Sequence, residues 1–329
     1  MSERADWRGS KILITGGLGF IGSNLARRLV ESGATVVLVD NLYPDYGGCL
    51  FNVSGIEAQV TVAIADVCDA DAMRPLLGDK DYLFNLAGQT GHMDSMTNPR
   101  RDLEINSAAQ LGILECCREV NPGIRIVFAS TRQLYGKPQY LPVDERHPIH
   151  PVDVNGINKL SGEWYHRLYY EVYGIRSSVL RLTNTYGPRM RIKDARQTFV
   201  GVWFRRILEG TPFEVWGGSQ LRDFTYVDDC VDAFLQAAAS DASSGKVYNL
   251  GGVESLSLLD LAKELVAVAG RGSYVVREFP AERKAIEIGD YYSDFSLIRD
   301  ELGWQPRVSL SSGLRKTLDY FTPNVSEYL

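Results

Sequence analysis

The chain has 329 residues, of which 45% are hydrophobic and 23% charged, so it can bury a large core as one large or two modest domains. Its formal net charge of −6 excludes the basic field that nucleic-acid and membrane binders carry, so we expect neither partner. The five cysteines lack CxxC or metal-ligand spacing, and the four histidines form no cluster with Cys or Glu. With a leader too polar for a signal peptide and no apolar run of membrane-spanning length, these features predict a cytoplasmic protein with reduced thiols and no metal.

A glycine-rich turn lies near the start of the chain, between a short apolar run and an amphipathic one. The order strand, turn, helix brings backbone N–H groups and a helix N-terminus close to a diphosphate. Such turns also simply connect strands to helices, but the context favours cofactor binding. The candidate residues are Gly16, Gly19, Phe20, Ile21 and Gly22.

Short apolar strands alternate with amphipathic helices through the first half, which is the pattern of a parallel sheet covered on both faces. Two long helices are expected, from Asn98-Pro99 to about 120 and over 156–173, because Asn caps a helix well and Pro suits its first turn. The further strands expected in this half are 35–39, 60–64, 82–87, 124–129 and 178–182.

The alternation loosens beyond about residue 185, and no linker or repeat separates the two parts. We expect a first domain over 1–185, with return segments around 225–250, and a smaller lobe made mainly of 186–329. The elements expected there are helices at 199–208, 231–239, 258–269 and after 311, and strands at 213–216 and 246–250.

Asp40 lies 18 positions after Gly22, at the end of the second expected strand. An acid there accepts hydrogen bonds from the adenosine ribose in a dinucleotide fold, and it repels a 2′-phosphate. No Arg follows it, so NAD is favoured over NADP; a capping or turn Asp is the alternative. Asp66 and Val67, after the third strand, either flank the adenine or form a simple strand-end turn.

Together with this turn, motifs along nearly the whole chain resemble the extended short-chain dehydrogenase/reductases, in particular the NAD-dependent nucleotide-sugar epimerases and dehydratases. The motifs are Thr15-Gly-Gly-Leu-Gly-Phe-Ile-Gly22, Val39-Asp40-Asn41-Leu42, Asn85-Leu86-Ala87-Gly88, Tyr135-Gly136, Arg222-Asp223-Phe224-Thr225-Tyr226-Val227-Asp228-Asp229 and Leu302-Gly303-Trp304-Gln305-Pro306. The resemblance implies an α/β fold: a Rossmann-type doubly wound parallel sheet holding NAD, and a smaller α/β C-terminal lobe binding a nucleoside diphosphate sugar. It also implies a homodimer formed through helices 98–120 and 156–173. Further implied cofactor contacts are Asn41, Leu86, Ala87, Gly88 and Lys159.

The catalytic set of that family is a Ser or Thr after the fifth strand and a Tyr-x-x-x-Lys motif on the next helix. Thr131 and Lys159 match, but Asn155 stands at the tyrosine position, 24 positions after Thr131 as the family spacing requires. A phenol with a pKa near 10, lowered by a neighbouring cation, can accept the substrate proton. An amide cannot ionise, so Asn155 only orients a hydroxyl or a water.

His92 is our candidate for the missing base, because it falls in the loop after the fourth strand, where the family lines its sugar pocket. Histidine has the best unperturbed pKa for proton transfer near neutrality. A loop histidine with a local hydrogen bond is the alternative. Weaker candidates are Asp94, a water held between Thr131 and Asn155, and Lys159 with a depressed pKa.

Arg132 and Gln133 stand where dehydratases of this family carry Asp-Glu and near where decarboxylases carry a Glu, which argues against ordinary 4,6-dehydration. Arg132 either faces an anionic group of the sugar, such as a carboxylate, or is structural. Arg222 matches the family arginine that pairs with the diphosphate, while Trp216 borders the base or is a core aromatic. The substrate-binding candidates are Thr90, Arg132, Gln133, Asn184, Gln197, Val200, Trp216 and Arg222, with Arg283 and Lys284 as further possible phosphate donors.

We therefore expect an NAD-dependent nucleotide-sugar epimerase that acts through a transient keto-sugar intermediate. One alternative is a dehydratase or other keto-sugar-modifying enzyme with a rearranged acid/base set around His92. Another is a non-catalytic protein that binds NAD and a nucleotide sugar, which the missing tyrosine would suit.

Overall fold

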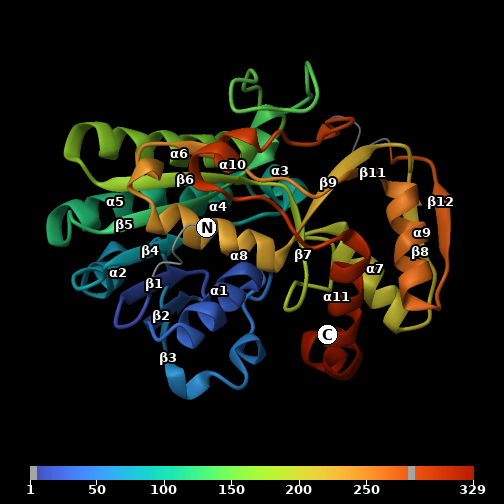
Figure 1. Ribbon diagram of the computed structural model, residues 1–329, viewed down its shortest axis with the longest axis horizontal. Coiled ribbons are helices and arrows are strands. Elements are labelled where there is room, and N and C mark those ends of the chain that lie inside the picture. Colours follow the sequence, from blue (N-terminus) through green and yellow to red (C-terminus); the bar gives the residue numbers. More distant parts are fainter. Residues whose placement is uncertain (1–5, 281–285) are drawn as a thin grey trace.

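A seven-stranded parallel sheet forms the larger part of the computed structural model, which describes residues 6–280 and 286–329 (Figure 1). A smaller lobe that carries the C-terminus lies beside it, and the expected α/β, Rossmann-type fold is confirmed. The strands of the large sheet, in spatial order, are β10 (Val247–Asn249), β6 (Arg176–Leu182), β5 (Arg125–Thr131), β4 (Tyr82–Asn85), β1 (Lys11–Thr15), β2 (Thr35–Asp40) and β3 (Val60–Ile64).

Helices cover both faces of this sheet, which is why β1 and β5 are apolar almost throughout. One face carries α1 (Phe20–Glu31) and α8 (Val227–Ala239), and the other carries α2 (Ala70–Leu77), α5 (Ala109–Val120) and α6 (Val154–Tyr173). The strand order reverses between β1 and β4, because β2 and β3 lie on one side of β1 and the later strands on the other. Ligands of open α/β sheets bind at such a switch point, outside the carboxyl ends of the strands.

The helix expected from 98 to 120 is interrupted by a π-turn at Glu104–Ala108, between α4 (Pro99–Leu103) and α5. Asn98 caps α4 as expected, with its side chain accepting a bond from the Arg101 N–H. No pattern in the sequence predicted the π-turn, a feature that is frequent at functional sites. The segment before it also differs from expectation: His92 is not in a loop but begins the short helix α3 (His92–Thr97).

The smaller lobe is built from two small sheets and three helices, and one further helix packs beside β10. The helix expected at 231 begins earlier, since α8 starts at Val227, directly after β9, and it packs on the large sheet and not in the smaller lobe. The elements of this part are β7 (Asn184–Tyr186), β9 (Leu221–Tyr226) and β11 (Ser255–Ser257) in one sheet, β8 (Phe213–Trp216) and β12 (Tyr274–Arg277) in the other, and helices α7 (Phe199–Leu208), α9 (Leu258–Ala269), α10 (Ser296–Leu302) and α11 (Leu310–Asn324).

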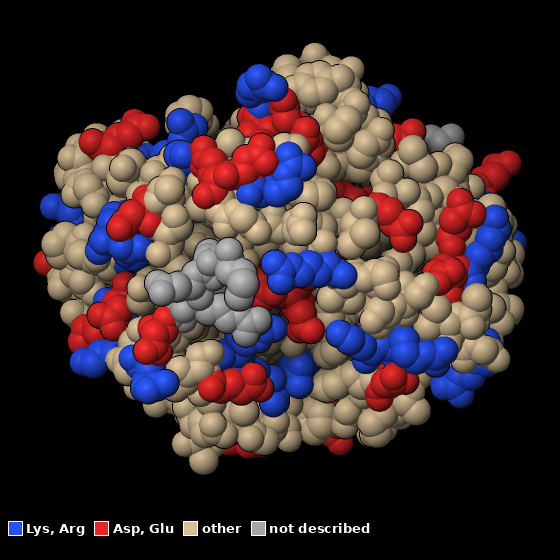
Figure 2. Space-filling model, in the orientation of Figure 1, with Lys and Arg blue, Asp and Glu red and all other residues tan. Residues whose placement is uncertain are grey.

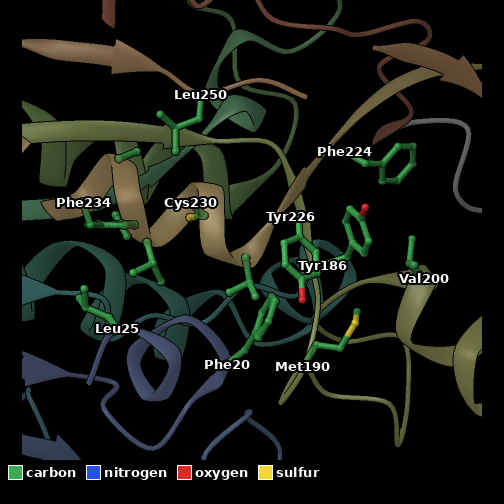
Figure 3. Close-up of a cluster of buried hydrophobic side chains, with 14 of the residues drawn as sticks. Phe20, Leu25, Tyr186, Met190, Val200, Phe224, Tyr226, Cys230, Phe234 and Leu250 are labelled. Carbon is green, nitrogen blue, oxygen red and sulfur yellow. The ribbon is translucent and has the colours of Figure 1, made fainter. Parts of the chain in front are cut away.

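One hydrophobic core joins the two parts of the molecule (Figure 3). Phe20 and Leu25 from α1 belong to the same buried cluster as Phe224 from β9, Val200 from α7 and Phe234 from α8. Burial of large side chains is the main favourable term in folding, so a shared core fixes the lobe against the sheet. The crevice between them is therefore a preformed feature.

Acidic and basic side chains are interspersed over the face of the molecule shown in Figure 2, with no field of a single sign. Within residues 6–280 and 286–329, no helix is long and apolar enough to cross a membrane.

Candidate active site

A large cavity opens at the carboxyl edge of the sheet, at the switch point between β1 and β4. The ends of β1, β2, β4 and β5 line it from the sheet side, and segments 182–185 and 191–198 line it from the smaller lobe. Most of the side chains expected at a site are brought together here. They are Gly16, Gly19, Phe20, Ile21, Gly22, Asp40, Asn41, Asp66, Val67, Leu86, Ala87, Gly88, Thr90, His92, Thr131, Arg132, Gln133, Asn155, Lys159, Asn184 and Gln197.

The turn after β1 is a close-fitting cradle that side chains would fill. Gly16 has a φ of +65°, and a Cβ on Gly22 would lie 2.3 Å from the Gly16 carbonyl oxygen. Gly19 caps α1 without any side-chain bond, so the first N–H groups of α1 are left for a ligand at the cavity wall. A diphosphate fits this arrangement, because it carries the charge and the acceptors that a helix N-terminus favours.

Asp40 ends β2 with its carboxylate at the cavity. The N–H of Leu18 donates to Oδ2 at 3.2 Å and the N–H of Leu42 to Oδ1 at 2.9 Å. Burial raises the pKa of this carboxyl, although these backbone bonds partly oppose the shift. Each oxygen keeps a free lone pair, which suits the two hydroxyls of a ribose.

Asp66 is held by partners that the sequence did not identify. Arg101 Nη2 lies 2.8 Å from Oδ2, Asn41 Nδ2 donates to the same oxygen at 3.1 Å, and the Cys68 N–H donates to Oδ1 at 2.9 Å. Burial alone would raise the pKa of Asp66, but the bonds from Cys68, Arg101 and Asn41 lower it to about 2. Asp66 is thus a fixed, ionised wall of the cavity.

Thr131 and Lys159 meet where β5 ends. Thr131 Oγ1 accepts the Gln133 N–H at 3.2 Å, which leaves its hydroxyl hydrogen available to the cavity. Lys159, on α6, donates from Nζ to the Ala129 carbonyl at 3.0 Å. Burial lowers the pKa of Lys159 to about 8, although the charge of Asp102 opposes this shift. A Cβ on Gly88 would lie 2.7 Å from Nζ, so only glycine lets the lysine come this close.

Asn155 is tied into the protein through its amide nitrogen. Nδ2 donates to the Gln89 carbonyl at 2.8 Å and to Asp102 Oδ2 at 3.1 Å. Asp102 is fully buried and also accepts from Asn158 Nδ2 at 2.8 Å, so two amides of α6 donate hydrogen bonds to one buried carboxyl group. Sequence reasoning missed Asp102, because nothing local marks an exposed-looking helix position as buried. The amide oxygen of Asn155 remains as an acceptor.

His92 and Asp153 lie in contact beside Asn155 and form an ion pair only when the imidazole is protonated. His92 Nδ1 lies 2.9 Å from Asp153 Oδ2, although the two are not aligned as a regular hydrogen bond. The Asp153 side chain is fully buried, whereas 39% of the His92 side chain is exposed. Asp153 also caps α6 by accepting the Gly156 N–H at 2.7 Å, and it accepts from Gln133 Nε2 at 3.0 Å. Burial alone would raise the pKa of Asp153, but these contacts, His92 first, lower it.

The remaining predicted residues are divided between the cavity and its surroundings. Arg132 Nη2 donates to Asn184 Oδ1 at 3.2 Å, and Gln197 Oε1 accepts the Arg191 N–H at 2.9 Å. Val200, Trp216 and Arg222 lie outside the cavity lining. Arg222 Nη2 instead pairs with Glu287 at 2.7 Å, and Trp216 Nε1 donates to Glu214 at 3.1 Å, so their substrate roles remain predictions. Arg283 and Lys284 lie outside the described residues.

Two arginines that the sequence reasoning did not single out also line the cavity from the smaller lobe. Arg191 Nη2 pairs with Asp194 at 2.6 Å, and the Arg196 guanidinium pairs with Asp45 and faces Asp94 at 3.6 Å. The pair with Asp45 crosses the cavity from the lobe to the segment after β2. Asp94, a weaker candidate for the base, is thus engaged by a cation.

Comparisons with known proteins agree with this geometry. The NAD dependent epimerase/dehydratase family matches residues 12–251. The chain is similar to the UDP-glucose 4-epimerase of Mycolicibacterium smegmatis (33% identical, covering 94% of this chain and 98% of the relative) and to UDP-glucuronic acid decarboxylase 1 of Xenopus tropicalis (31% identical, 94% and 72%). It is also similar to the crystal structure of the UDP-glucose 4-epimerase of Thermotoga maritima with UDP-glucose, with a TM-score of 0.87, 30% identity and coverage of 96% and 99%.

Proposed function

This chain belongs to the NAD-dependent epimerase/dehydratase family, and from that premise we propose that it is a nucleotide-sugar epimerase that acts through a transient keto-sugar. Its cofactor is NAD, which, when bound, accepts a hydride from a carbinol carbon of the sugar and later returns it. The residues present suit that cofactor. The glycine cradle and the α1 N-terminus would hold the diphosphate, Asp40 would hold the adenosine ribose, and Asp66 and Val67 would flank the adenine.

The observation that carries the proposal is the His92–Asp153 pair in the cavity that also contains Thr131 and Lys159. A carbinol can lose a hydride only if its hydroxyl proton is accepted at the same time, and Asn155 cannot accept it. His92 Nε2 is the nitrogen opposite the one that faces Asp153, so it can take this proton while the carboxylate stabilises the imidazolium. The Thr131 hydroxyl orients the substrate oxygen, and His92 returns the proton when the ketone is reduced.

An epimerase is favoured over a dehydratase by the side chains after Thr131. Elimination of water needs a second acid/base group at the neighbouring carbons, and Arg132 and Gln133 provide no carboxyl there. Asp153, which accepts a bond from Gln133, is already occupied by the α6 cap, Gln133 and His92. A keto-sugar that turns over and is reduced on its other face needs only the one proton-transfer group.

A decarboxylase is a second candidate, because one similar protein is named UDP-glucuronic acid decarboxylase 1 and Arg132 could face the carboxyl group of such a sugar. A sugar with a carboxyl group at C5 becomes a β-keto acid when its C4 is oxidised. The bond from C5 to the carboxyl carbon then breaks, carbon dioxide leaves, and the electron pair enters an enolate with the C4 oxygen. C5 of that enolate takes up a proton from solvent or from protonated His92, so a cationic neighbour such as Arg132 would decide only the substrate.

We also propose that the protein is a homodimer through α5 and α6. Ile157, Trp164 and Leu168 lie on one side of α6 and are 55%, 54% and 48% exposed. Leu111 of α5 is 36% exposed, and α5 packs against α6. Contiguous exposed apolar side chains on paired helices are typical of an interface, and a second copy would cover them by the same two helices.

The direct test is to incubate the purified holoprotein with UDP-, GDP-, CDP- and dTDP-sugars. We expect NMR in deuterated water to show an inverted carbinol without deuterium at the neighbouring carbon, and transient NADH absorbance. Deuterium at that carbon would favour an enolised intermediate and hence a dehydratase-like path, and carbon dioxide release would favour the decarboxylase. Unchanged sugars across the panel, with NAD still bound, would refute an enzymatic role and leave a binding protein.

A further inference from the structure

Arg132 is a partly buried residue whose guanidinium has one nitrogen, Nη1, without a protein partner in the described part of the chain. It is the first residue of a 3-10 turn, directly after Thr131 at the end of β5. Nη2 donates to Asn184 Oδ1 at 3.2 Å, and the guanidinium carbon lies 4.9 Å from the centre of the Tyr291 ring. Nη1 is shielded from solvent and makes no hydrogen bond within the described residues. The plane of the guanidinium is therefore fixed while one edge is left unused.

No charged side chain among the described residues forms an ion pair with Arg132. Arg222 is the nearest other cation and is already paired with Glu287 at 2.7 Å. Asp223 is buried close by, and its Oδ2 accepts the Ser293 N–H at 3.1 Å. Its Oδ1 has no hydrogen-bond partner among the described residues, and no ion pair there joins it to Arg132. Burial, followed by the charge of Arg222, lowers the pKa of Arg132 to about 10. An anionic partner at the shielded Nη1 would stabilise this cation.

We propose that Arg132 binds a carboxylate on the sugar, so that the substrate of the proposed epimerase is a nucleoside diphosphate uronic acid or similarly carboxylated sugar. The inference rests on the proposed function, because it assumes that Thr131 lies at the reacting carbinol. Arg132 adjoins Thr131 in the chain and lines the same cavity, so its ligand is a group close to that carbinol. A carboxylate matches a guanidinium edge because both are planar and can form two parallel charge-assisted bonds.

A diphosphate is the other anion that this cavity would receive, and its effect can be separated from that of a carboxylate. If Arg132 bound the diphosphate, its loss would weaken the binding of UDP, of a neutral UDP-sugar and of the corresponding uronic acid alike. If it binds the sugar carboxylate, its loss would weaken the binding of the uronic acid alone. If Arg132 only supports the fold by balancing Asp223, its loss would lower stability and leave the preference between the two sugars unchanged.

The test compares matched pairs of ligands on the NAD-loaded protein by isothermal titration calorimetry. The pairs are UDP-glucuronate with UDP-glucose, UDP-galacturonate with UDP-galactose, and GDP-mannuronate with GDP-mannose. We expect the wild type to bind the acid of at least one pair about tenfold or more tightly, and Arg132→Met to abolish that difference with neutral-sugar and UDP affinities within about twofold. Arg132→Lys keeps the positive charge but loses the paired N–H donors of the guanidinium, so it should retain part of the preference for the acid. It is also the second variant to measure if Arg132→Met unfolds.

Arg146→Met is the matched control, because it also removes one positive charge but its side chain is 91% exposed and pairs only with Asp144 in the described structure. It should preserve the preference. A wild type that prefers the neutral sugar in every pair, or binds no uronic acid, overturns the inference, while turnover of a neutral sugar would leave the proposed epimerase standing. Conversely, an Arg132-dependent preference for the acid without any turnover supports the inference and removes the enzyme proposal.

Discussion

At the scale of single residues, the role of each polar group in the site depends on whether it still has an unused hydrogen-bond donor or acceptor. Asn155 uses its amide nitrogen on Gln89 and on the buried Asp102, which makes it part of the framework. His92 lines the cavity with Nδ1 2.9 Å from Asp153 Oδ2, and within residues 6–280 and 286–329 its Nε2 makes no hydrogen bond. We propose that Asn155, at the position expected for the family tyrosine, is structural in this protein and that the base lies on a different element.

His92→Ala should lower kcat by about 10²–10⁴-fold and change KM by only a few-fold, because general acid–base catalysis contributes in that range. Steady-state kinetics across a pH series would measure this, and the pH profile of kcat should also change. His150→Ala is a suitable control, since His150 is exposed and lies outside the cavity lining. Equal kcat for His92→Ala and wild type would remove His92 from the mechanism.

Asn155→Ala should destabilise the protein by about 1–3 kcal/mol, because Asp102 Oδ2 and the Gln89 carbonyl each lose a buried donor. Urea denaturation of the holoprotein measures this cost, and the pH profile of turnover should keep its shape. A stability equal to that of wild type, or a pH profile altered as in His92→Ala, would show that Asn155 is catalytic and not structural.

At the scale of elements, α6 connects the site to the core. Its first residues and the Asp153 cap face the cavity, and its middle packs on β5 through Lys159 and His166. His166 is fully buried, stacks on Phe128 at 4.4 Å and has Nδ1 2.8 Å from the Gly162 carbonyl. Because a carbonyl only accepts, Nδ1 carries the hydrogen and Nε2 is left as an unpaired acceptor in an apolar layer.

Burial lowers the pKa of His166 to about 4, so the folded protein holds this imidazole neutral while the unfolded chain protonates it near pH 6.5. The unfolded state therefore binds more protons between these values, and the free energy of unfolding falls as the pH drops from 6.5 towards 4. When the pH is lowered from 7.5 to 5, the free energy of unfolding of His166→Phe should therefore fall by roughly 2 kcal/mol less than that of the wild type. Urea denaturation at the two pH values tests this; identical pH dependence in both proteins would contradict it.

At the scale of the whole molecule, the cavity exists because a smaller lobe shares its core with the doubly wound sheet. The sheet supplies the cofactor side through the ends of its strands, and segments 182–185 and 191–198 supply the opposite wall. The proposed dimer would cover α5 and α6, whose exposed apolar side chains lie on the face of the sheet away from α1 and α8.

Replacing Trp164 and Leu168 together by Glu should convert a dimer into a monomer, because two charges would be buried without partners at the interface. Light scattering after size-exclusion chromatography should give twice the chain mass for wild type and the single mass for the variant. Val276→Glu, on β12, is the control, as Val276 is equally apolar and 50% exposed but lies in the smaller lobe. A wild type that is already monomeric would refute the interface.

Sequence reasoning placed elements and residues correctly where their positions depend on local order along the chain. A strand followed by glycines and a helix specifies a cradle wherever it occurs, and Asp40 is placed by the length of one strand–helix–strand unit. The same is true of Thr131, which ends β5, and of Lys159, whose helix was expected at nearly the observed bounds. These features hold because hydrogen bonds of strands and helices fix them within short segments.

Only the tertiary structure decided which side chains meet. Asp153 reads as an ordinary helix cap, and its contact with His92 exists because α3 packs beside the start of α6. Asp102 is hidden by the packing of α4 on α6, and Arg132 is fixed by Tyr291, which lies in another part of the chain. Patterns of hydrophobicity determine which segments form helices and strands, whereas the partners of a buried charge depend on how distant segments pack. The sequence by itself therefore determined the fold and the cofactor. The folded chain determined where the proton and the sugar are proposed to bind.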